Sequence, residues 1–198
     1  ALAKKFVKAG CTHASYSLES GSDVILEAMN KRVKKKYFSE QVRICKEAGL
    51  ITNTSLVLGY PQETKETIAE SMTQLEELRV YPSTGYLLPL PETEMWRYAI
   101  DNGYIKDIDK YLIQITERQD FSLNLTKMSQ EQLESETLSW LERLNKTFGN
   151  SLPKEKLIKT GGYDKHGQSQ KKDRSRTVDR NKNTVETFNY ATQEGTVR

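Results

Sequence analysis

Tyr16-Ser17-Leu18-Glu19-Ser20-Gly21-Ser22-Asp23 decides how this chain folds. The first residues of the stretch predict the end of a strand, and residues 24–29 predict the helix that follows. Residues 20–23 fit a Ser-x-x-Asp capping box, in which a hydroxyl accepts a hydrogen bond from a backbone N–H of the first turn. Glu19 is then a carboxylate at the carboxyl end of a strand, where α/β sheets and barrels bind ligands. On spacing alone, a solvated acid beside a helix start is the alternative.

Helices and strands are predicted to alternate on both sides of this stretch. The predicted elements are a helix over 1–9, a strand over 12–18, a helix over 23–29, a helix around 37–48, a strand over 51–58, a helix over 64–78, a strand over 84–88 and a helix over 93–102. Alternation with short connections predicts parallel strands with helices outside them, because right-handed crossovers are favoured. Three strands are too few to close a barrel, so we expect an α/β open unit or part of a barrel.

The character of the chain changes after Gly103. A short helix over 107–115, an extended piece over 121–125 and a long helix over 129–148 are predicted, the last one beginning with a capping box of Ser129 and Gln132. From about residue 159 onward aliphatic residues are almost absent, which predicts a disordered tail. We therefore divide the chain into three parts: the α/β unit over 1–105, a helical C-terminal extension over 106–158, and a polar, basic tail over 159–198.

Composition excludes few classes of protein. The 198 residues carry a net charge of +3 with acids and bases interspersed. This argues against an overall positive electrostatic potential that would attract nucleic acids or membranes. The apolar runs are too short to span a bilayer. Cys11 and Cys45 are far apart and fit reduced thiols, so we expect a cytoplasmic protein. Since the chain opens with Ala inside a predicted helix, we expect it to be a fragment of a longer protein.

Three blocks of the sequence together resemble one enzyme family. Residues 18–23, followed by Met29-Asn30-Lys31, are similar to the fourth-strand region of radical S-adenosylmethionine (SAM) enzymes, in the branch that often carries a cobalamin-binding domain. Residues 46–49 and 58–64 resemble the fifth-strand segment with its Gly-x-Pro-x-Glu-Thr turn. Residues 89–94 resemble the sixth-strand exit, although Glu92 stands where the family usually has Gly.

The resemblance implies the C-terminal half of a partial (β/α)₆ TIM-like barrel and the cofactor SAM. In the family, a Cys-x-x-x-Cys-x-x-Cys loop holds a [4Fe-4S] cluster that reduces SAM to release a 5′-deoxyadenosyl radical. That motif is absent here, and Cys11 and Cys45 do not match it. The cluster ligands are therefore expected upstream, no metal ligand is assigned to this chain, and the chain alone is expected to be inactive. Cobalamin is a possible further cofactor of this branch.

The resemblance also implies a set of cofactor-binding residues. Glu19 would accept hydrogen bonds from the ribose hydroxyls of SAM, a role suited to a carboxylate. Ser17 and Ser55 would add polar contacts near the ends of adjacent strands. Leu58 and Gly59 would approach the adenine, since Gly permits a close passage of the backbone. No catalytic residue and no substrate, small or macromolecular, can be assigned.

Other residues have plainer interpretations, and two other functions stay open. Glu63 is interpreted first as an acid before a helix start, and His13 as a structural residue away from the rim. One alternative is a non-catalytic α/β binding module whose basic run over 171–176 contacts RNA or acidic partners; a solvated tail competes with this reading. The other is a conventional barrel enzyme that binds phosphate at a helix N-terminus, which the scarcity of glycine in the strand-to-helix turns disfavours.

Overall fold

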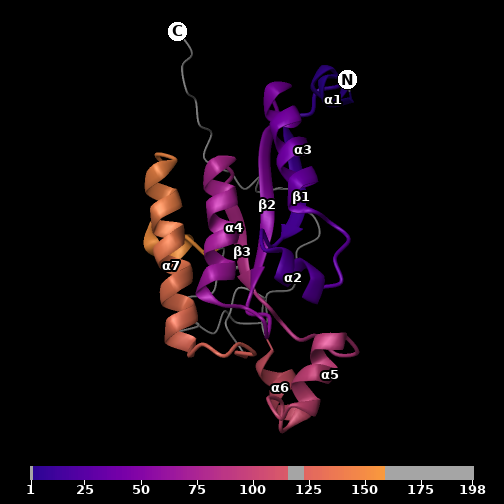
Figure 1. Cartoon of the computed structure of the whole chain (residues 1–198), viewed down its shortest axis with the longest axis vertical. Coiled ribbons are helices and arrows are strands. Elements are labelled where there is room, and N and C mark those ends of the chain that lie inside the picture. Colours follow the sequence, from indigo (N-terminus) through magenta and orange to yellow (C-terminus); the bar gives the residue numbers. More distant parts are fainter. Residues whose placement is uncertain (1, 116–122, 159–198) are drawn as a thin grey trace, which may run out of the picture. The chain divides into compact units, whose positions relative to one another are not determined.

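Three parallel strands form the sheet of this protein. A computed structural model of the chain describes residues 2–115 and 123–158, and its strands are β1 (His13–Glu19), β2 (Ile51–Leu58) and β3 (Pro82–Tyr86). They pair in the order β1-β2-β3, with His13 opposite Ile51 and Thr54 opposite Pro82 (Figure 1). The predicted parallel α/β architecture is therefore confirmed.

Helices separate the strands, as the sequence predicts. They are α1 (Leu2–Lys8), α2 (Asp23–Ala28), α3 (Lys35–Glu47), α4 (Lys65–Glu77), α5 (Glu94–Asp101), α6 (Ile108–Gln114), α7 (Gln130–Thr147) and the 3₁₀ turn η1 (Lys154–Lys156). Figure 1 shows the strands pointing toward the end of the sheet beyond which α5 and α6 lie. None of the helices within the described ranges is both long and apolar enough to cross a bilayer.

The two faces of the sheet differ in polarity and burial. Along β2, residues 52, 54, 56 and 58 are buried, whereas the alternating residues 51, 53, 55 and 57 keep some exposure. Leu56 and Leu58 belong to a core that includes Val42 of α3 and Met72 of α4. On the other face, Ser and Asn side chains are prominent, and this face is called the open face below. A half-barrel has this arrangement, since its inner face lacks the facing strands.

Helix α7 is part of the same core as the strands. Leu133, Leu141 and Leu144 are fully buried in it, and Arg143 pairs with Glu76 of α4 at 2.8 Å between Nη2 and Oε2. The core thus crosses the predicted boundary between residues 105 and 106, although the division into domains stays a prediction. A second, smaller cluster joins α5 and α6; its buried members are Trp96, Ala99, Ile105, Tyr111 and Leu125.

The helix starts predicted near residues 64, 93 and 129 are confirmed, whereas the capping box predicted over residues 20–23 is wrong. The hydroxyls of Thr64, Thr93 and Ser129 cap α4, α5 and α7. The capping box over residues 20–23 does not form, because α2 begins after Ser22, which makes no side-chain cap. The Ser20 hydroxyl turns toward α4 and instead accepts a hydrogen bond from the Ser22 amide at 3.1 Å.

Two predicted elements differ in position or extent. The third strand covers residues 82–86 rather than 84–88, because its ladder with β2 sets its bounds. Of the predicted extended piece, residues 123–125 are not in a strand and residues 121–122 lie outside the described residues, as does the tail from 159.

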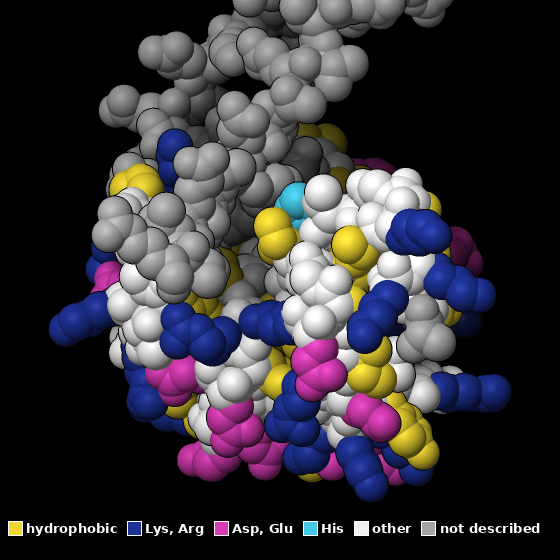
Figure 2. Space-filling view, turned by 90° about the horizontal axis from the view of Figure 1, so that it is seen from above, with side chains coloured by type: hydrophobic (Ala, Val, Ile, Leu, Met, Phe, Trp, Pro, Cys, Tyr) yellow, Lys and Arg dark blue, Asp and Glu magenta, His cyan; other side chains and the backbone are white. Residues whose placement is uncertain are grey.

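Figure 2, viewed from the amino ends of the strands, shows acidic and basic side chains interspersed on that end of the molecule.

Replacement of Leu141 tests whether α7 belongs to the core. Leu141→Ala removes a fully buried side chain and is expected to lower the free energy of unfolding by about 2–5 kcal/mol. Leu112→Ala, on the exposed side of α6, is the control and should cost less than about 1 kcal/mol. Urea unfolding followed by circular dichroism measures both; equal losses would contradict a core shared by α7 and the sheet.

Candidate cofactor site at the carboxyl edge of the sheet

Glu19 ends β1 in an unusual backbone conformation. The pairing register with β2 shifts between Tyr16 and Glu19, and the φ of Glu19 is +68°. A non-glycine residue in the left-handed region is costly, and such residues concentrate at functional sites. An irregularity of this kind also re-aims the side chain at the end of a strand.

The Glu19 carboxylate is held by one oxygen and left without a donor at the other. Its Oε1 lies 3.1 Å from Nζ of Lys31, and the side chain of Glu19 is only 18% exposed. Its Oε2 is buried and, among the residues that the structure describes, meets no hydrogen-bond donor. Buried acceptors are nearly always paired, so an orphan carboxylate oxygen fits a ligand that brings hydroxyl donors.

The end of β2 supplies a second polar atom and a close backbone approach. Ser55 Oγ is buried and likewise has no partner within the described part of the chain. Gly59 follows β2 with a φ of +103°, a conformation that favours glycine. The Leu87 amide donates to the Leu58 carbonyl at 2.7 Å and so extends the pairing of β2 and β3 up to this turn.

The five residues predicted for the cofactor do not all share one environment. Glu19 and Gly59 lie at the carboxyl ends of neighbouring strands, and Ser55 lies on the open face. Ser17 is exposed on β1. The Leu58 side chain is fully buried in the core under the helices, so that the half-buried Val57 faces the open side instead. Contact of these residues with a cofactor stays a prediction.

The buried side chain of Glu63 is hydrogen-bonded to the backbone of the turn that follows β2. Glu63 precedes the N-cap of α4, as predicted, but its side chain is only 2% exposed. Its Oε2 accepts from the Gly59 amide at 3.2 Å, and its Oε1 accepts from the Thr67 hydroxyl. Burial raises the pKa of Glu63 to about 7, although both hydrogen bonds act in the opposite direction.

Two residues near Glu19 were not predicted as parts of the site. Lys31 enters the sequence analysis only through the resemblance of residues 29–31, because its approach to Glu19 depends on the path of the chain after α2. Tyr60 is half-buried, and its pKa is raised by burial and then by the negative charges of Glu19 and Glu94. The sequence contains no local signal that would have paired either residue with Glu19.

The cysteines do not form a cluster site. Cys11 is exposed, and the Sγ of Cys45 accepts a hydrogen bond from the Tyr16 hydroxyl at 2.9 Å. Within the described ranges, no group of three or more His, Cys, Asp or Glu side chains is placed to hold a metal ion. These described residues therefore supply no set of ligands for an iron–sulfur cluster.

Comparison with known proteins is consistent with this geometry. Residues 1–75 match the family model of the Radical SAM superfamily. The chain is 30% identical over 105 residues to an uncharacterized methyltransferase of Pyrococcus horikoshii, covering 52% of this chain and 23% of the relative. It is 30% identical over 71 residues to a tRNA-2-methylthio-N(6)-dimethylallyladenosine synthase of Desulfosudis oleivorans, covering 35% of this chain and 15% of that protein.

A longer alignment reaches into the C-terminal part of the chain. Over 179 residues the chain is 28% identical to the bacteriochlorophyllide d C-8(2)-methyltransferase of Chlorobaculum tepidum, covering 85% of this chain and 39% of the relative. The chain therefore spans less than half the length of each of these three proteins.

The ionisation of Glu63 should make stability depend on pH. Because folding raises the pKa of this carboxyl to about 7, its contribution to stability is lost as the pH rises toward that value, by up to about 1.4 kcal/mol per pH unit. Glu63→Gln removes the titration and should gain stability relative to the wild type between about pH 5 and about pH 8. Urea unfolding at several pH values measures the difference between the two proteins; a difference that stays constant with pH would contradict the buried, titrating carboxyl.

Proposed function

Residues 1–75 belong to the radical SAM superfamily, and from that premise we propose that this chain forms the SAM-binding part of a longer radical SAM enzyme. The observation that carries the proposal is the buried Oε2 of Glu19, which has no donor in the described structure and lies at the carboxyl end of a parallel strand. Ribose hydroxyls would supply the missing donors.

Each residue near the edge has a distinct part in this proposal. Glu19 binds the ribose, and Lys31 orients it through the 3.1 Å ion pair at Oε1. The Gly59 backbone passes close to the adenine, and Glu63 holds that backbone through the Gly59 amide. The half-buried Val57 on the open face offers the aliphatic contact that the sequence assigned to Leu58. When a reduced iron–sulfur cluster is also present, SAM supplies the radical for the reaction.

The remaining chemistry must come from outside this chain. We propose that the cluster ligands lie in a preceding segment, so that this chain alone would be inactive. Cobalamin is a further possible cofactor, which only the resemblance of the 18–31 segment supports. The names of the relatives include methyltransferases and a tRNA-modifying enzyme, so the proposal extends to a radical-based transformation and leaves the substrate open.

Replacement of Glu19 tests the proposed site. In the full-length protein, reconstituted anaerobically with iron and sulfide, Glu19→Ala should weaken SAM binding about 10- to 100-fold, since hydrogen bonds to a charged group contribute about 1.5–3 kcal/mol. Isothermal titration calorimetry measures the affinity, and the cluster absorbance should be unchanged, because Glu19 is not a cluster ligand.

Glu27→Ala is the matched control, since Glu27 is an exposed acid on the adjacent helix α2. It should bind SAM as the wild type does. Equal affinity of the Glu19 and Glu27 variants would contradict the proposal, as would a full-length protein that lacks three closely spaced cysteines upstream of this chain.

A further inference from the structure

Helix α4 carries a buried polar stripe along the side that faces the sheet turns. Thr67 and Ser71 are four residues apart on α4 and therefore lie on one side of the helix, whereas Glu63 precedes the N-cap and joins them by accepting a hydrogen bond from the Thr67 hydroxyl. The exposed fractions of Glu63, Thr67 and Ser71 are 2%, 8% and 0%. We call these three residues the α4 stripe. Burying three polar side chains in a row is costly unless each one is hydrogen-bonded, so their partners show what the stripe holds.

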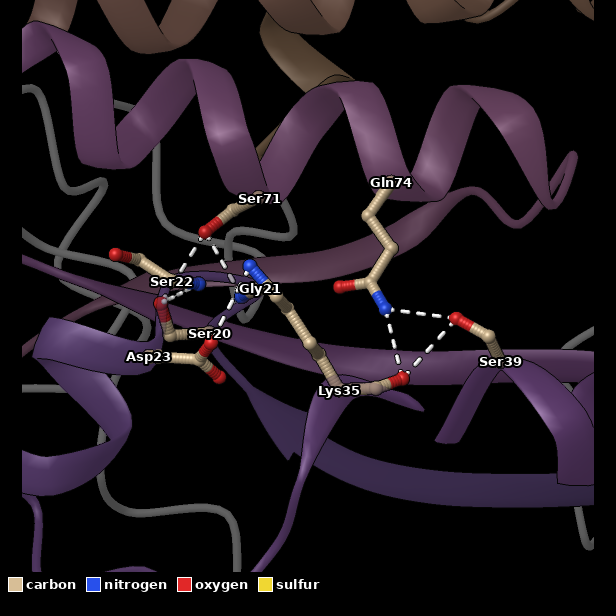
Figure 3. Close-up of polar contacts among 8 residues, drawn as sticks. All are labelled: Ser20, Gly21, Ser22, Asp23, Lys35, Ser39, Ser71 and Gln74. Carbon is tan, nitrogen blue, oxygen red and sulfur yellow. Dashed lines mark hydrogen bonds and ion pairs between the residues drawn. The ribbon is translucent and has the colours of Figure 1, made fainter. Parts of the chain in front are cut away.

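One end of the stripe holds the turn that follows Glu19. The Gly21 amide donates to Ser71 Oγ at 2.8 Å, and the hydroxyls of Ser20 and Ser71 lie 3.2 Å apart (Figure 3). The turn also lies directly against the helix: a Cβ on Gly21 would be 2.7 Å from Ser71 Cα. Only glycine fits this approach, so the turn and α4 are held at a defined separation.

The other end of the stripe holds the turn that follows β2. There Glu63 accepts from the Gly59 amide and from the Thr67 hydroxyl. The Glu63 amide in turn donates to the Tyr60 carbonyl at 2.8 Å. The turn from Gly59 to Glu63 is thus closed by both the backbone and the side chain of Glu63.

The two ends are joined within the helix. Ser71 donates its single hydroxyl hydrogen to the Thr67 carbonyl at 3.0 Å, so its oxygen is left to accept from Gly21 and Ser20. A continuous series of contacts therefore runs from the Gly21 amide through Ser71, Thr67 and Glu63 to the Gly59 amide. One turn further along α4, Gln74 Nε2 donates to the Lys35 carbonyl and to Ser39 Oγ at the start of α3 (Figure 3).

We propose that Ser71 is a positioning residue of the cofactor site, which sets the turn after Glu19 relative to the turn at Gly59 through the α4 stripe. Ser71 itself lies inside the core and approaches no ligand. The inference rests on the proposed function only in that the two turns are taken to hold the two ends of one nucleoside. The link between the two turns does not depend on the proposed function, because it is argued from contacts within the protein alone.

Amide hydrogen exchange of this chain tests the link directly. Ser71→Ala leaves the Gly21 amide without its acceptor, and loss of a buried hydrogen bond costs about 1–3 kcal/mol. Exchange should accelerate about tenfold or more at Gly21 and, through the stripe, also at Gly59. Acceleration at Gly21 alone, or at neither amide, would overturn the proposal.

Thr137→Ala is the matched control variant. Thr137 is fully buried on α7, and its hydroxyl donates to the Leu133 carbonyl four residues before it, as Ser71 does within α4. The variant should lose comparable stability and leave exchange at Gly21 and Gly59 as in the wild type. Acceleration at both amides in the control would show general loosening and would also overturn the proposal.

A binding measurement separates this inference from the proposed function. In the reconstituted full-length protein, Ser71→Ala should weaken SAM affinity about five- to tenfold, whereas Thr137→Ala should leave it unchanged. Unchanged affinity in Ser71→Ala, together with weakened affinity in Glu19→Ala, would overturn the positioning role and keep the proposed function. A wild-type protein that binds no SAM would instead overturn the proposed function, and the exchange result would still decide the link.

Discussion

A buried polar atom without a partner costs about 1–3 kcal/mol, and this constraint organises the carboxyl edge of the sheet. Along the α4 stripe the constraint is met, because Ser71 and Glu63 both find partners. At Glu19 Oε2 and Ser55 Oγ it is not met by the described residues. Other orphan atoms lie away from the open face: the hydroxyls of Thr52 and Thr84 are on the side of the sheet that the helices cover, Ser22 Oγ is at the start of α2, and Gln74 Oε1 is on α4. The exceptions on the open side are therefore the ones that a ligand would satisfy.

The open face makes sense as part of a larger structure. Ser15 pairs in register with Asn53, and Ser55 with Ser83, so small polar side chains line neighbouring strands. A core face would instead carry more aliphatic side chains, like Leu18, Leu56 and Leu58 on the helix-covered side. Such a face suits the inner wall of a barrel that encloses a ligand, which accords with the superfamily match over residues 1–75. Its polarity is compatible with many substrates and selects none.

Local patterns predicted much of this fold, and contacts between distant residues account for what they missed. The order of strands and helices and the capping box at Ser129 depend on neighbours in sequence, and both were predicted. The hydroxyl of Ser20 was assigned to a cap, because its partner Ser71 lies 51 residues away. The ion pair of Glu19 with Lys31 was missed because it depends on how the chain turns back after α2. The basic run over residues 171–176 lies outside the described residues, so its contact with RNA or acidic partners stays a prediction.

The central claim is that SAM binds at the carboxyl ends of β1 and β2, between two turns that α4 holds. Hydrogen exchange of the reconstituted full-length protein, measured with and without SAM by mass spectrometry, tests it most directly. The account predicts slower exchange on SAM addition in peptides that cover residues 16–23 and 57–63, with no change in peptides at the amino ends of the strands. Protection confined to other segments, or none in these two, would contradict it.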